Sequence, residues 1–173
     1  MMTIAKAISY KDFVMAAILD TIAISLILFI PAISHLVAYP LHAFEPMRII
    51  LFGVILLMPH KKWNAITLAA LLPIVSFLVS GHPLFPKNIV MSGELVLNVA
   101  LLFLFVNITG KYSVSVLLSM LASKVVYYIS KFLLIYYGAL HVEMFSTSIY
   151  FQMIVIAVFS LAFLQYDKKK TKA

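Results

Sequence analysis

Cysteine is absent from this chain, and charged residues make up only 11% of its 173 residues. The absence of cysteine excludes a disulfide framework, thiol catalysis and a cysteine-ligated metal. Soluble domains contain about 25% charged residues and about 45–50% apolar ones, whereas 64% of this chain is hydrophobic. The composition, with a mean hydropathy of +1.10, therefore predicts a protein embedded in a lipid bilayer.

Long apolar segments occupy most of the chain. A spanning helix takes about 20 residues, so six such helices leave no room for a soluble domain. We expect a single integral membrane domain over 1–173, an all-α bundle of six transmembrane helices. Pro31 is expected to kink the first helix, which is retained as an anchor because it lacks a signal-cleavage pattern. The expected spans are approximately 13–37, 47–59, 63–79, 88–108, 113–137 and 147–166.

Basic residues orient this bundle. The chain has 13 Lys plus Arg against 6 Asp plus Glu, a net charge of +7. Arg48 and Lys87 fall on one face under this threading, and nine lysines fall on the other. The nine are Lys6, Lys11, Lys61, Lys62, Lys111, Lys168, Lys169, Lys170 and Lys172. The positive-inside rule then predicts both termini in the cytoplasm, N-in/C-in, in a cell (inner, cytoplasmic) membrane. Contact with anionic lipid explains the charge, and nucleic acid is not an expected partner.

Polar residues recur inside the expected spans, where each needs a physical reason. Glu94 and Asn98 are spaced i, i+4 and share one face of the fourth helix. Lys124, Tyr128 and Lys131 form a similar stripe on the fifth helix, which runs the opposite way. One interpretation is structural, with Glu94 paired to Lys131 and amides joining the helices. The other is a ligand pocket, because two lysines and one glutamate leave a positive surplus that an anion would satisfy.

Further candidates border this region. Gln152 enters the sixth helix from the outside and reaches a similar depth. His82 precedes the Glu94 helix in an outer loop, where it either belongs to the interfacial belt or covers the pocket. His42 and Glu45, in the other outer loop, are candidates for the same covering role. A carboxylate-bearing or zwitterionic solute arriving from outside fits such a pocket.

The first helix carries two features of its own. Asp20 lies near its cytoplasmic end, and we expect it to pair there with Lys111 or a terminal lysine, or else to act as a buried base. Ala17, Thr21 and Ser25 recur every four residues, a small-residue stripe that allows another helix to approach closely. That helix belongs either to this chain or to a partner.

Several classes of function find no support in the motifs. The five histidines show no metal-binding spacing, and no nucleotide-binding or serine-hydrolase motif occurs. We expect no cofactor, no metal, no ATP hydrolysis by this chain and no enzymatic activity.

The combination resembles the S component, the substrate-binding membrane subunit, of an energy-coupling factor (ECF) vitamin transporter. The resemblance covers the whole chain: its length, six helices, both ends inside, and polar residues in helices four to six beneath outer loops. It implies partnership with a transmembrane T component and two cytoplasmic ATPase subunits. It also implies a coupling stripe at Ala17, Thr21 and Ser25, although the family's AxxxA pattern is not literally present. The implied solute-binding residues are Glu94, Asn98, Lys124, Tyr128, Lys131, Gln152 and His82.

Two other functions are compatible with the same residues. A membrane scaffold of the rod-shape-determining type is also small, six-helical and basic inside, but it needs no deep polar pocket. A lipid-acting membrane enzyme would use Glu94 or Asp20 as a base and would open toward the bilayer. The hypothesis of a solute-binding subunit differs from both, because it predicts that Glu94→Ala and Lys131→Ala reduce solute binding.

Overall fold

The structure is a computed structural model, and it describes residues 10–37, 45–80, 85–141, 143–144 and 149–172. Within these residues the chain forms six helices and no strands, which confirms the all-α prediction. The helices are α1 (Tyr10–Val37), α2 (Pro46–Leu57), α3 (Lys62–Ser80), α4 (Phe85–Thr109), α5 (Tyr112–Tyr136) and α6 (Ile149–Lys172).

Five of these helices are long and apolar enough to cross a membrane, and α2 is a shorter apolar helix of 12 residues. Large apolar side chains such as Phe29, Leu78 and Phe132 are exposed on the outside of the bundle. A chain in water would bury these side chains, whereas lipid accommodates them. The structure therefore has the character of a multi-pass membrane protein.

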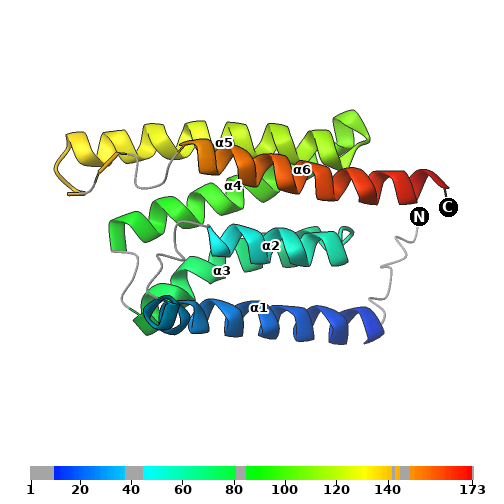
Figure 1. Cartoon of the computed structure of the whole chain (residues 1–173), viewed down its shortest axis with the longest axis horizontal. Helices are drawn as coiled ribbons and strands as arrows, with labels where there is room; N and C mark the ends of the chain where they lie inside the picture. The colour runs from blue at the N-terminus through cyan, green and yellow to red at the C-terminus, as the bar shows by residue number, and fades with distance from the viewer. Residues whose placement is uncertain (1–9, 38–44, 81–84, 142, 145–148, 173) are drawn as a thin grey trace, which may run out of the picture.

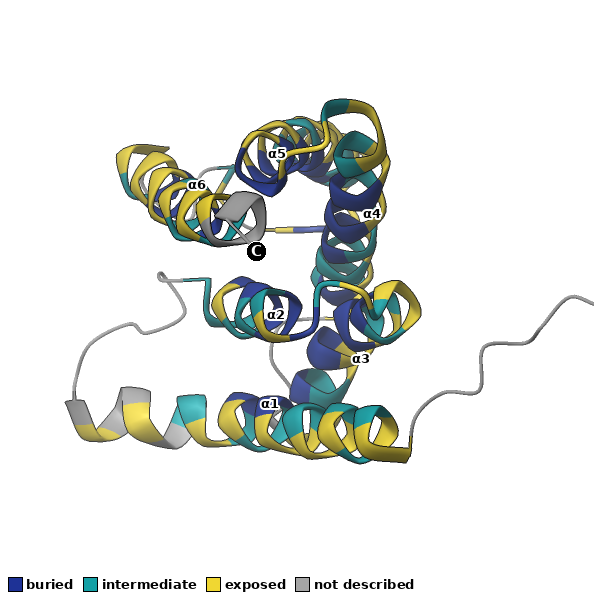
Figure 2. Cartoon of the chain, turned by 90° about the vertical axis from the view of Figure 1, so that its right-hand side faces the viewer, coloured by how far each residue is buried: buried dark blue, intermediate teal, exposed yellow. Residues whose placement is uncertain are grey.

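The helices alternate in direction along the length of the molecule (Figure 1). The first turn of α1 and the last turn of α6 lie at the same end, and we call this end the terminal end. Seen from there, α2 lies inside the arrangement, with α1, α3 and α6 around it (Figure 2). Exposed residues cover the outward faces of the helices, and most buried residues face inward.

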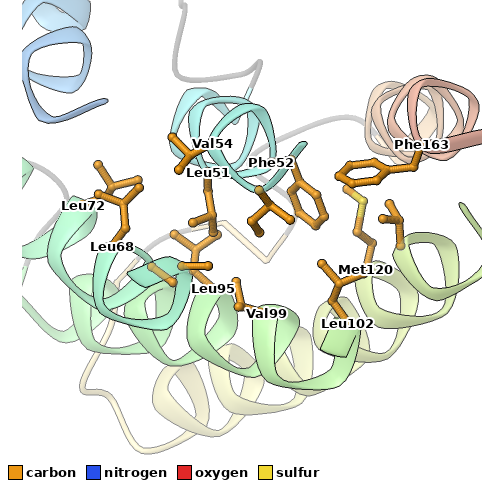
Figure 3. Close-up of a cluster of buried hydrophobic side chains, with 14 of the residues drawn as sticks. Leu51, Phe52, Val54, Leu68, Leu72, Leu95, Val99, Leu102, Met120 and Phe163 are labelled. Atoms are coloured by element: carbon orange, nitrogen blue, oxygen red, sulfur yellow. The ribbon is translucent and has the colours of Figure 1, made fainter. Parts of the chain in front are cut away.

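Helix α2 forms the centre of the apolar core (Figure 3). Leu51, Phe52 and Ile55 on α2 are almost completely buried. Phe52 contacts Phe163 of α6 edge-on, with 6.0 Å between the ring centroids. The core is completed from α3, α4 and α5 by Leu68, Leu72, Leu95, Val99, Leu102 and Met120.

Proline and glycine set several helix boundaries. α4 begins at Phe85, three residues before the expected start at 88, because Pro86 is tolerated in the first turn of a helix. α2 ends at Leu57, two residues before Pro59. Gly110 ends α4 with a φ of +69°, and its N–H donates to the Val106 carbonyl at 2.9 Å. Pro31 lies inside α1 and does not end it. In Figure 1 most of α1 lies across the picture, whereas its last part is seen nearly along the helix axis.

Helices α4 and α5 pack closely because α5 presents small side chains to the interior. Ser115, Ser119 and Ser123 follow one another every four residues, and all three are completely buried. Each hydroxyl donates to a carbonyl of its own chain three or four residues earlier. Their polarity is thus satisfied locally, and their small size lets the neighbouring helix approach.

Asp167 of α6 caps the first turn of α5. The N–H groups of Tyr112 and Ser113 donate to its two carboxylate oxygens at 3.0 and 2.9 Å. The Ser113 hydroxyl donates to it at 2.8 Å. Lys111, the residue preceding α5, makes no side-chain cap of its own, so a neighbouring helix satisfies these N–H groups.

We predict that Asp167→Ala destabilises the protein by about 0.5–2 kcal/mol, the usual cost of losing a helix cap. The free energy of unfolding can be measured by SDS titration in mixed micelles. Asp12→Ala is the matched control, because Asp12 is half-exposed at the same end and its shortest described ion-pair distance, to Lys61 Nζ, is 3.7 Å. Equal effects of the two substitutions would contradict the capping role.

Candidate functional site

Four charged side chains from α2, α4 and α5 form a closed set of ion pairs, which we call the charge ring: Glu45, Arg48, Glu94 and Lys124. Arg48 Nη1 donates to Glu45 Oε2 at 2.5 Å, and Arg48 Nη2 donates to Glu94 Oε1. Lys124 Nζ pairs with Glu45 Oε1 and lies 3.5 Å from Glu94 Oε1. Each cation therefore contacts both carboxylates, and the four formal charges cancel.

The charge ring lies deep within the bundle. Lys124 is the middle residue of α5, about 18 Å from either end at about 1.5 Å per residue. The side chains of Arg48 and Glu94 are only 3% and 7% exposed. A single charge at this depth costs at least about 2.5–3.5 kcal/mol, so none of the four is tolerated alone. Mutual compensation makes their joint burial possible.

The start of α2 explains how Glu45 and Arg48 come together. Glu45 directly precedes Pro46, the first helical residue, and its backbone adopts the left-handed conformation with φ 51° and ψ 54°. Its carbonyl accepts hydrogen bonds from the N–H groups of Arg48 and Ile49 at 2.9 and 3.2 Å. The carboxylate then meets the guanidinium three residues later. Because α2 is about 18 Å long and a bilayer core is about 30 Å thick, its first turn can lie well inside the membrane.

Two buried groups beside these ion pairs lack hydrogen-bond partners among the described residues. Both amide atoms of Asn98 are unpartnered, and the residue is completely buried. Arg48 Nε is a buried donor without an acceptor. A buried polar group left unsatisfied costs about 1–3 kcal/mol. Asn98 lies one turn beyond Glu94 on the same face of α4, so the unsatisfied atoms adjoin the charge ring.

Aromatic and amide side chains continue the polar region toward α6. Tyr127 is buried, its ring centroid is 5.5 Å from Lys124 Nζ, and Tyr128 contacts it edge-on at 5.3 Å. Gln152 Nε2 donates to the Tyr128 hydroxyl at 2.6 Å. The structure therefore brings Glu94 together with Lys124, and Tyr128 together with Gln152.

Lys131 is separate from this set. It is buried, but its Nζ donates to the Met144 carbonyl at 2.7 Å. The expected pairing of Glu94 with Lys131 is wrong, because Glu94 pairs with Arg48 and Lys124 instead. Lys131 lies two helical turns from Lys124 toward the other end of α5, and no described ion pair joins it to the ring. His82 and His42 lie outside the described residues.

Two members of the charge ring were not predicted as site residues. Arg48 was assigned only to the outer basic residues, and Glu45 only to a covering loop. The signal that could have found them is Glu-Pro-Met-Arg at 45–48, with opposite charges three residues apart at the start of an apolar helix. A short apolar segment after this motif further indicates that the pair lies below the membrane surface.

The features of α1 differ in part from expectation. Asp20 accepts a hydrogen bond from Asn64 of α3 at 2.9 Å, so its partner among the described side chains is an amide; the side chains of Lys169, Lys170 and Lys172 lie outside them. Ala17 and Thr21 are exposed and Ser25 is half-buried. The buried face of α1 instead carries Ala23 and Ile27. Most of the small-residue stripe is therefore not used for packing within the described chain.

We predict that Arg48→Leu and Glu94→Leu each lower the free energy of unfolding by about 3–5 kcal/mol, because each leaves a buried charge without its partner. The double variant should lose much less than the sum, since Glu45 and Lys124 remain as a neutral pair. SDS unfolding titrations of the wild type and these three variants form the required double-mutant cycle.

The control is the double variant Arg48→Leu with Lys124→Leu. It removes the same number of charges but leaves two carboxylates facing each other, so it should be the least stable protein of the series. Strict additivity in both double variants would contradict the coupled ring.

Comparison with known proteins found no match to a family model, to a curated protein or to a solved structure. The functional argument therefore rests on the charges and the unsatisfied polar atoms of the site itself.

Proposed function

We propose that the chain is the substrate-binding subunit of an ECF-type uptake transporter and that it takes up a small anionic or zwitterionic solute from the outside. The observation that carries this proposal is the charge ring with its unsatisfied neighbours, Arg48 Nε and the Asn98 amide. If the ion pairs served stability alone, a buried amide without a partner beside them would only lower the stability of the fold. A solute that supplies the missing acceptor and donor accounts for both features.

The chemistry of the site narrows the class of solute. Arg48 and Lys124 provide cationic donors for a carboxylate, while Glu45 and Glu94 accept from an ammonium group. Tyr127 and Tyr128 offer aromatic surface beside the charges. The solute thus combines a charged head with a body that packs against aromatic rings, as a vitamin or an amino-acid derivative does.

The exposed part of α1 supports the proposed partnership. Ala17 and Thr21 present small side chains outward, and the Thr21 hydroxyl donates to the Ala17 carbonyl at 2.7 Å. With this hydroxyl satisfied internally, the surface can meet a helix of a T component closely. Two cytoplasmic ATPase subunits would supply the energy for tilting the subunit and releasing the solute inside. The chain itself performs no covalent chemistry.

A scaffold of the rod-shape-determining type is the second candidate. The internal neutrality of the charge ring and the satisfied Nζ of Lys131 favour it. In this case the ring would only hold α2, α4 and α5 together, and no solute would enter.

We predict that the wild-type protein, purified in mild detergent, carries a small molecule detectable by native mass spectrometry. Glu94→Ala and Asn98→Ala should reduce its occupancy at least about tenfold, which corresponds to about 1.4 kcal/mol of lost binding. Asn64→Ala is the control, since Asn64 contacts Asp20 and lies outside the ring. Lys131→Ala, also expected from the sequence to weaken binding, tests whether the pocket extends that far. A wild-type protein without any bound molecule, under native extraction, would favour the scaffold.

We further predict an N-in/C-in orientation, and the absence of cysteine makes the test simple. Single cysteines at Lys111 and Lys168 should react with an impermeant maleimide only after the membrane is opened. A cysteine at Glu143 should react in intact cells. The reversed pattern would overturn the orientation and the outward-facing pocket with it.

A further inference from the structure

The two carboxylates of the charge ring are held in different ways. Glu94 lies within α4, nine residues from its start, and its side chain is 7% exposed. Glu45 precedes α2, and its side chain is 15% exposed. It is also the one described residue other than glycine with a positive φ. The left-handed conformation is sparsely populated for a residue with a side chain. The Glu45 carbonyl accepts from the N–H groups of Arg48 and Ile49, and its carboxylate is held by the ion pairs with Arg48 and Lys124.

We propose that Glu45 is a built-in substitute for the solute's own carboxylate. A carboxylate of the solute takes its place on Arg48 and Lys124, while Glu94 remains bound to both cations. This inference rests on the proposed function and specifies the solute: the group that enters the ring is a single carboxylate.

Charge balance supports a single carboxylate as the group that takes the place of Glu45 on the two cations. Glu45 precedes α2 and its side chain is 15% exposed, so its carboxylate would have to move outward to water when it leaves the two cations. Arg48, Lys124 and Glu94 then leave a net charge of +1 in a region that tolerates none. One carboxylate restores neutrality. A dianionic head would leave a charge of −1, and a cationic head would raise the charge to +2.

The unsatisfied atoms indicate which hydrogen bonds a bound solute could make that Glu45 does not make. With Glu45 withdrawn, Arg48 has two donors to offer, Nη1 and the unsatisfied Nε. Asn98 adds an amide donor and acceptor on the Glu94 face of α4. A solute with a polar group next to its carboxylate can use all of these, whereas Glu45 leaves Nε and Asn98 without partners.

The test is chemical rescue of the full-length protein, with sodium acetate as the probe. Glu45→Ala should be destabilised, and acetate should raise its unfolding temperature in a saturable manner. Sodium chloride at equal ionic strength should not. Glu94→Ala should show no comparable rescue, because its position is enclosed within α4. Glu143→Ala is the control for a carboxylate outside the ring.

Glu45→Gln provides the same test if the alanine variant does not fold, since the glutamine keeps the size of the side chain. Its neutral amide competes weakly, so acetate should stabilise it at a concentration at least about tenfold lower than the wild type requires, equivalent to about 1.4 kcal/mol. Equal rescue of the Glu45 and Glu94 variants, or rescue of neither, would overturn the inference.

The outcomes also separate this inference from the proposed function. Acetate rescue confined to the Glu45 variants supports the exchangeable position even if native mass spectrometry finds no bound molecule. A bound molecule that is lost from Glu45→Gln as completely as from Glu94→Ala supports the transporter subunit and overturns the exchange.

Discussion

The mutual compensation of four buried charges is the interaction on which the rest of this structure depends. In lipid, Arg48 or Lys124 alone would be expelled toward water, and Glu45 or Glu94 alone would oppose burial equally. Joined in a ring, they connect the start of α2 to the middle of α5 through α4. The ring thus determines how deep α2 lies. The apolar face of α2 then follows, because Leu51 and Phe52 come one turn later on the same helix.

The placement of α2 shows how a membrane protein can use a helix too short to span. A full-length helix at this position would fill the interior from one surface to the other. The 12 residues of α2 leave the remaining depth to polar groups from α4 and α5. Polar backbone and side chains at membrane depth are tolerated only where protein encloses them. The burial of Arg48 and Glu94 within the bundle satisfies this condition.

The sequence predicted the helices well because their positions depend on nearby residues: apolar runs form the helices, and Pro, Gly and Lys mark their ends. It also predicted that polar residues of three successive helices would lie in the outer half of the membrane, with Lys131 level with Glu94 and Lys124 deeper. The structure instead brings Lys124 to Glu94. The sequence did not predict the partners. Glu94 had several cations within plausible reach, and only the position of α2 among α1, α3 and α6 brings Arg48, and not Lys131, to it. Asp20 met Asn64 for the same reason, because the contact depends on how α1 lies against α3.

The Asp167 cap has a consequence for how α5 and α6 are joined. It fixes α6 to the first turn of α5 at the terminal end through three hydrogen bonds. Near the opposite end, Gln152 of α6 donates to the Tyr128 hydroxyl of α5. The Asp167 carboxylate therefore joins the two helices at the terminal end independently of the contacts around Tyr128.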